Sequence, residues 1–166
     1  MAKIEGKDFK TGAKAFSLAP VKVAGQDATE YTLLLWHHAD VPPQTYTFSV
    51  AGWQMGQDDV WVLARAFAET PALLEATLPM DLWRTGRPQR ACLCVSADWL
   101  HVTLCGNPKQ QKVRIVLYIK EGTDPEIFRR VFIQTDVEQA RRFGLELEQE
   151  IIEAAPEWAS ERELRR

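Results

Sequence analysis

An alternating segment at residues 112–120 restricts the possible folds more than any other part of the chain. It is followed by a second segment and then by a predicted helix. Every second residue of the first segment is a large aliphatic one, namely Val113, Ile115, Leu117 and Ile119. This period of two is typical of a β-strand with one buried face. Turn-forming residues occupy 122–125, and residues 127–134 then predict an antiparallel partner strand. A short helix starting at Pro125 is the competing interpretation.

A long helix is predicted from residue 136 to residue 155. Thr135 and Glu138 form the pattern T-x-x-E, in which each side chain bonds a backbone N–H group at the start of a helix. Apolar residues then recur at spacings of three and four until Pro156. Gly144 lies within this apolar stripe, which predicts that the helix approaches the sheet closely there.

The first half of the chain predicts three or four strands and then a helical segment. Residues 31–38 are apolar on both faces at their centre, and residues 45–51 alternate. The helical segment is predicted near residues 58–78, with an apolar stripe formed by Val60, Leu63, Ala64 and Phe67. Trp36 and Trp61 fall within these elements and are expected in the core.

A β-hairpin is predicted around a two-residue turn at residues 97–98. With that turn, Cys92 faces Thr103 on the opposite strand. The same register places Cys105 opposite Arg90 and collects the aliphatic residues on one face, which is the usual determinant of register.

These segments together predict an α+β fold with antiparallel sheets arranged as meanders. The helical segment near 58–78 and the long C-terminal helix near 136–155 are expected to pack on the sheet. Residues 1–156 are expected to form a single domain, and residues 157–166 a frayed, charged tail.

Composition narrows the possible functions. The 166 residues carry a formal net charge of −3, so the whole chain has no electrostatic attraction to nucleic acid or to acidic membranes. No apolar run reaches the roughly 20 residues that cross a bilayer. The three cysteines are crowded between residues 92 and 105, unlike a disulfide framework. We therefore expect a cytoplasmic protein without a membrane partner.

Soft metal ligands share one face of the predicted hairpin: Cys92, Cys94, His101 and Cys105. Sulfur and imidazole ligands suit zinc, but four ligands spread over a pleated face rarely converge on a tetrahedron. Small side chains packed beneath a helix are the simpler interpretation. A nucleophilic Cys94 activated by His101 is a further alternative, although neither an orienting carboxylate nor oxyanion donors are evident. We therefore expect no cofactor and favour a non-enzymatic role.

Basic and aromatic residues share the outward face of residues 112–134. They are Lys112, Arg114, Tyr118, Lys120, Phe128, Arg130 and Phe132. Such a face suits single-stranded nucleic acid, because cations bind phosphates and rings stack on bases. The alternative is a sheet buried on both faces, with Phe128 and Phe132 in a second core beneath the helical segment at residues 60–78.

Three tryptophans lie at or near predicted loops: Trp53, Trp83 and Trp99. Loop aromatics often mark contacts with a protein partner. Our first hypothesis is therefore a non-enzymatic protein-binding module, such as an adaptor or inhibitor, that is also free to form homo-oligomers. Single-stranded nucleic-acid binding is the alternative, and a small metal- or cysteine-dependent enzyme is the remote one.

Two architectural resemblances concern the order of elements. A strand run into a helix, twice over, is similar to the Whirly-type single-stranded-DNA-binding proteins, and the segment from Phe132 to Asp136 resembles how each half of that fold ends. This chain lacks their lysine-rich motif. Residues 31–152 also resemble small bacterial immunity proteins, which inactivate toxins by binding them. The first resemblance implies nucleic-acid binding and the second implies a protein partner.

Overall fold

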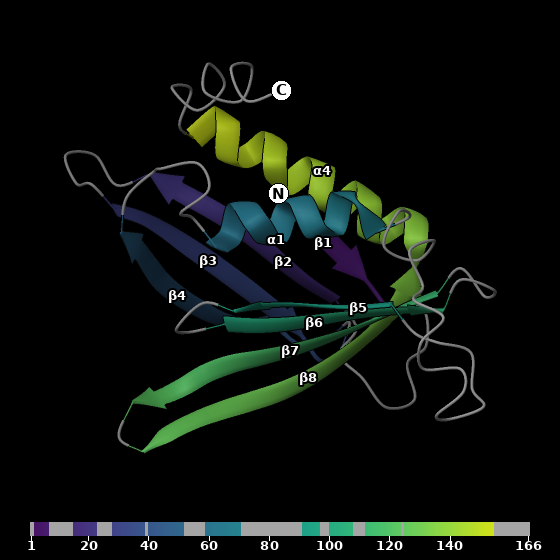
Figure 1. The fold of residues 1–166 in the computed structure, drawn as a ribbon. Coiled ribbons are helices and arrows are strands. Elements are labelled where there is room, and N and C mark those ends of the chain that lie inside the picture. Colours follow the sequence, from purple (N-terminus) through teal and green to yellow (C-terminus); the bar gives the residue numbers. More distant parts are fainter. Residues whose placement is uncertain are drawn as a thin grey trace.

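The described residues form four strands and a helix, followed by four more strands and a C-terminal helix (Figure 1). This computed structural model describes residues 2–6, 15–22, 28–38, 40–51, 59–70, 91–96, 100–107, 112–123 and 125–154. The elements of the first half are β1 (Ala2–Glu5), β2 (Ala15–Lys22), β3 (Ala28–Trp36), β4 (Gln44–Ala51) and α1 (Asp59–Ala68). Those of the second half are β5 (Ala91–Ser96), β6 (Leu100–Asn107), β7 (Lys112–Thr123), β8 (Glu126–Asp136) and α4 (Val137–Ala154).

Each half contributes one antiparallel sheet whose strands are in sequence order. Sheet A is β1-β2-β3-β4 and sheet B is β5-β6-β7-β8. The predicted α+β class, with meandering antiparallel sheets and a long C-terminal helix, is confirmed. Residues 127–134 pair with β7 as a strand, so the alternative of a helix starting at Pro125 is wrong.

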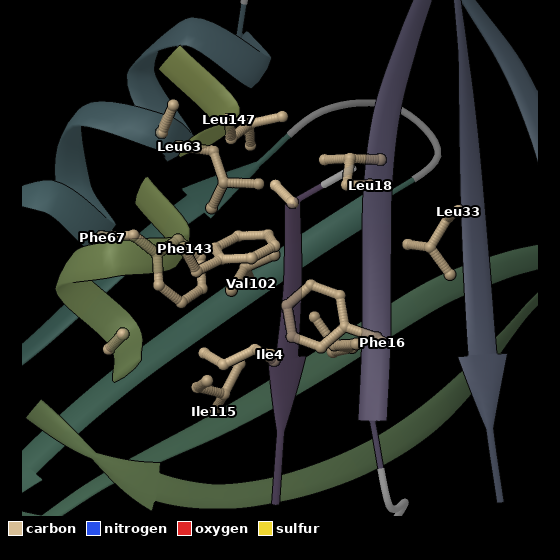
Figure 2. Close-up of a cluster of buried hydrophobic side chains, with 14 of the residues drawn as sticks. Ile4, Phe16, Leu18, Leu33, Leu63, Phe67, Val102, Ile115, Phe143 and Leu147 are labelled. Carbon is tan, nitrogen blue, oxygen red and sulfur yellow. The ribbon is translucent and has the colours of Figure 1, made fainter. Parts of the chain in front are cut away.

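The buried apolar residues that the structure describes form one core, where the inner faces of both sheets meet helices α1 and α4. Figure 1 shows α1 and α4 side by side over crossing sheets, and α4 packs against β1 and β2. Sheet A contributes Phe16 and Leu33, and sheet B contributes Ile115 and Val102 (Figure 2). The predicted burial of one face of β7 is confirmed. The aliphatic residues on that face are all buried, namely Val113, Ile115, Leu117 and Ile119.

Three aromatic rings from three elements meet at the centre of this core (Figure 2). The ring of Phe143 on α4 lies 5.0 Å from that of Phe16 on β2 and 4.8 Å from that of Phe67 on α1. Both contacts are edge-to-face, the geometry in which the positive edge of one ring meets the negative face of the other. This cluster joins both helices to sheet A.

Gly144 lies where α4 approaches the backbone of α1 rather than a sheet. A Cβ atom built at Gly144 would lie 2.2 Å from the backbone nitrogen of Ala68 and 2.6 Å from the carbonyl oxygen of Ala64. The predicted contact with the sheet is therefore wrong. The missing side chain lets the backbones of two helices touch.

The cap of α4 is shifted by one residue from its predicted position. The Oδ1 atom of Asp136 accepts a hydrogen bond of 2.8 Å from the backbone N–H of Gln139. Thr135 still lies in β8, and its buried Oγ1 atom has no hydrogen-bond partner among the described residues. Asp136 takes the capping role because the β-ladder of β8 continues to this residue.

The cap assignment predicts opposite outcomes for two neighbouring substitutions. Asp136→Ala removes the acceptor of the Gln139 N–H and is expected to lower the free energy of unfolding by about 1 kcal/mol. Thr135→Val replaces an unpaired buried hydroxyl by a methyl group of similar size and is expected to be neutral or stabilising. Urea unfolding of both variants measures this, and the reverse order of stabilities would restore Thr135 as the cap.

Two further predictions require correction. Strands β5 and β6 pair two residues out of the predicted register, so that Cys92 faces Cys105 and Cys94 faces Thr103. The connection between the strands is longer than the two-residue turn on which the prediction relied.

Trp36 is half-buried rather than in the core. The ammonium group of Lys3 lies over its indole ring, 4.5 Å from the ring centroid. Trp61 is buried, as predicted.

Candidate functional site

The candidate site is the face of sheet B that points away from the core. The register of β7 and β8 pairs Tyr118 with Arg130, Val116 with Phe132, and Lys120 with Phe128. The alternation of each strand places these residues on the side opposite Val113, Ile115, Leu117 and Ile119. We call this the cation–aromatic face, and it consists of Lys112, Arg114, Tyr118, Lys120, Phe128, Arg130 and Phe132.

Two arginines enclose the ring of Phe132. The guanidinium carbon of Arg114 lies 4.6 Å from the ring centroid, and that of Arg130 lies 4.4 Å from it. Arg130 also reaches Tyr118, at 5.9 Å from the centroid of that ring. Arg114, Phe132, Arg130 and Tyr118 thus form a row in which cations and aromatic rings alternate. Cation–π attraction holds both side chains against the sheet.

The charges of this row are not neutralised by the described part of the chain. Arg114 and Arg130 are exposed, and neither forms an ion pair with another described residue. Lys120 differs, because its ammonium group lies 3.1 Å from a carboxylate oxygen of Glu126. Two stacked guanidinium groups therefore present N–H donors to solvent.

Both described helices pack on the other side of the sheet. Helix α1 lies against α4, and its buried residues Leu63 and Phe67 belong to the core formed with the inner faces. The second core that we considered for Phe128 and Phe132 is therefore not formed by α1. Both rings are half-buried. Residues 71–78 of the predicted helical segment lie outside the described residues.

For the other predicted site residues, the structure describes either nothing or the backbone alone. Trp53, Trp83 and Trp99 lie outside the described residues, so the protein-contact prediction stays a prediction. Strand pairing places Cys92, Cys94, His101 and Cys105 on the same face of sheet B as Arg114, but their side chains are outside the description. Among the side chains that are described, no three His, Cys, Asp or Glu residues are placed to hold a metal ion. Zinc binding by the Cys and His residues therefore stays a prediction.

A polar cluster joins the two sheets, and the sequence analysis did not identify it. The Tyr46 hydroxyl on β4 donates a hydrogen bond of 2.8 Å to Glu121, whose carboxylate lies 2.8 Å from Nε of Arg129. Arg129 also donates to the side-chain oxygen of Gln44 at 2.6 Å. Lys120 and Gly122 both pair with β8 while Glu121 between them does not, so Glu121 occupies a β-bulge. A bulge changes the direction in which a side chain points, here toward sheet A. The alternation of apolar residues in the sequence does not reveal such a bulge.

This cluster gives the protein a pH-dependent contact between its sheets. Burial, followed by the hydrogen bond to Glu121, raises the pKa of Tyr46 from 10.0 to about 12. Because the folded-state pKa lies above the unfolded value, the stabilisation is complete below about pH 10 and is lost as the pH rises through about 12. In an absorbance titration of tyrosinate, Tyr46→Phe is expected to remove the ionisation step near pH 12. Tyr118→Phe is the matched control and should retain that step, whereas a step unchanged in Tyr46→Phe would contradict the assignment.

A surface pocket between β1 and α4 offers a different chemistry. Its volume is about 240 Å³, and its lining residues are Lys3, Glu5, Gln139, Arg142 and Glu146. Two cations and two carboxylates balance each other there. Unlike the cation–aromatic face, this pocket has no preference for an anionic ligand.

Comparisons with protein-family models, with curated proteins and with solved structures gave no match to this chain. None of the helices within the described residues has the length and apolar character needed to cross a membrane. The geometry of the cation–aromatic face therefore carries the functional argument.

Proposed function

We propose that the chain is a non-enzymatic binding protein that holds single-stranded nucleic acid on the cation–aromatic face of sheet B. The observation that carries this proposal is the row of Arg114, Phe132, Arg130 and Tyr118, in which two exposed guanidinium groups are stacked on rings and unpaired with any described carboxylate. Such a row offers binding groups for both parts of a nucleotide.

The two parts of a nucleotide match the two kinds of side chain. A guanidinium group that stacks on a ring keeps its N–H donors at its edge, where they can bond phosphate oxygens. Unstacked bases lie on aromatic rings or on guanidinium planes. Only single strands expose their bases in this way, because the bases of a duplex are already stacked and paired. The chemistry therefore favours a single strand over a duplex.

The acidic net charge does not oppose local binding. Helix α4 carries exposed or half-buried acidic residues, including Glu146, Glu150 and Glu153, and it packs on the inner side of the sheets, away from the cation–aromatic face (Figure 1). At about 0.15 M salt the Debye length is roughly 8 Å, so distant surface charges are largely screened. A strand at sheet B interacts mainly with Arg114, Arg130 and Lys112.

The experiment is a titration of the purified chain with a labelled single-stranded oligonucleotide over a series of salt concentrations. We compare the wild type with Arg114→Gln/Arg130→Gln. The matched control is Arg141→Gln/Arg142→Gln, which removes the same charge from α4. Each phosphate contact to a single strand contributes about 0.7 to the slope of log affinity against log salt concentration. Loss of two contacts should therefore reduce the slope by about 1.4 and weaken binding at low salt.

The control pair of substitutions should leave both affinity and slope close to those of the wild type. Equal effects of the two double variants would show that binding follows net charge rather than this face. If the wild type did not bind at low salt, the nucleic-acid proposal would fail. The hypothesis of a protein partner, with Trp53, Trp83 and Trp99 as its contacts, would then be favoured.

A further inference from the structure

Two cysteines hold directly opposite positions on neighbouring strands of sheet B. Cys92 on β5 pairs with Cys105 on β6. The Cα atoms of opposite residues in an antiparallel pair are about 4.5 to 5.5 Å apart. This separation lies within the roughly 4.4 to 6.8 Å that a disulfide spans. The backbone therefore places these two positions within reach of a covalent bond without rearrangement.

The third cysteine does not hold such a position. Cys94 pairs with Thr103, so Cys105 is its diagonal neighbour. Diagonal neighbours are about 7 to 8 Å apart, beyond the reach of a disulfide. Cys92 and Cys94 lie on one strand at a spacing of two, about 6.6 Å apart, at the outer limit of that reach. Among the three cysteines, the sheet geometry thus selects the pair of Cys92 and Cys105.

We propose that Cys92 and Cys105 form a reversible disulfide in exchange with a low-molecular-weight disulfide such as oxidised glutathione. One cysteine thiolate attacks the oxidant, forms a mixed disulfide and releases one glutathione thiolate. The second cysteine thiolate then attacks the mixed disulfide, forms the bond between Cys92 and Cys105 and releases a second glutathione. Two electrons pass from the protein to the oxidant, and the two protein protons end on the two glutathione thiols.

The pair lies at one edge of the described part of sheet B. β5 is an edge strand there, so the disulfide would join the edge of the sheet to the neighbouring strand β6. The proposal concerns covalent chemistry and does not depend on nucleic-acid binding.

The test incubates the full chain, under native conditions, in buffers of increasing ratio of oxidised to reduced glutathione. The wild type is expected to lose the mass of two hydrogen atoms, to retain one of its three reactive thiols, and to yield a crosslinked peptide joining Cys92 to Cys105. Added dithiol should restore all three thiols. Cys94→Ser should form the same crosslink but retain no free thiol, and added dithiol should restore both of its thiols. Cys105→Ser should not form the crosslink.

A control in urea tests whether the selectivity for this pair of cysteines depends on the folded structure. Unfolded chains lack strand pairing, so the selectivity for Cys92 with Cys105 should disappear there. The proposal is overturned if the native wild type accumulates stable glutathione adducts at both residues without forming the crosslink. It is also overturned if the crosslink joins Cys94 or two chains. Neither readout depends on oligonucleotide binding, so this proposal and the proposed function can fail separately.

Discussion

Replacing Phe143 by Ala is expected to lower the free energy of unfolding by about 3 to 5 kcal/mol. The ring is 1% exposed and makes edge-to-face contacts with Phe16 on β2 and Phe67 on α1. The substitution removes buried apolar surface and leaves a cavity where three elements meet, and the surrounding structure relaxes into such a cavity only in part (Figure 2). Urea unfolding followed by tryptophan fluorescence measures the change.

Phe128→Ala is the matched control for this loss. Phe128 is half-buried on the outer face of sheet B, so its truncation should cost clearly less than that of Phe143. A double-mutant cycle between Phe16→Leu and Phe143→Leu should show a coupling energy of about 0.5 to 1.5 kcal/mol for the ring pair. Equal losses for Phe128→Ala and Phe143→Ala, without coupling, would contradict the central position of the Phe143 ring.

Gly144→Ala is expected to lower the free energy of unfolding by about 1 to 3 kcal/mol. In an isolated helix this change is favourable by about 1 kcal/mol, because Ala has the higher helix propensity. Here the new Cβ atom would lie 2.2 Å from the nitrogen of Ala68 and 2.6 Å from the carbonyl oxygen of Ala64. Both atoms belong to the backbone of α1, so the helices must separate to accommodate it.

Gly122→Ala provides the matched comparison for Gly144→Ala. A Cβ atom at Gly122 would lie 3.2 Å from the carbonyl oxygen of Pro125, at the turn between β7 and β8. A shift of a few tenths of an ångström relieves that contact, so the loss should be smaller than for Gly144→Ala. If Gly144→Ala instead raised stability by its helix-propensity gain, the two helices could not be in backbone contact at this position.

The row of Arg114, Phe132 and Arg130 was only partly predictable. The alternation of β7 and β8 placed basic and aromatic residues on one face, because side chains in a strand alternate with a period of two. It could not decide whether the face was covered, since that depends on where α1 packs. The ring of Phe132 and its two guanidinium groups come together through β7–β8 pairing, which local sequence does not display.

Local sequence patterns were sufficient to predict strand β7, helix α4 and the apolar faces that these two elements bury. The period-two pattern of β7 and the spacing of three and four in α4 are local, and they predicted the class and the apolar stripes correctly. Tertiary structure alone decided that Gly144 contacts α1, that Glu121 turns toward Tyr46, and that Cys92 faces Cys105. These outcomes depend on helix crossing, a β-bulge and the length of a strand connection. Each of them joins segments distant in sequence or shifts a register without changing the local pattern of apolar residues.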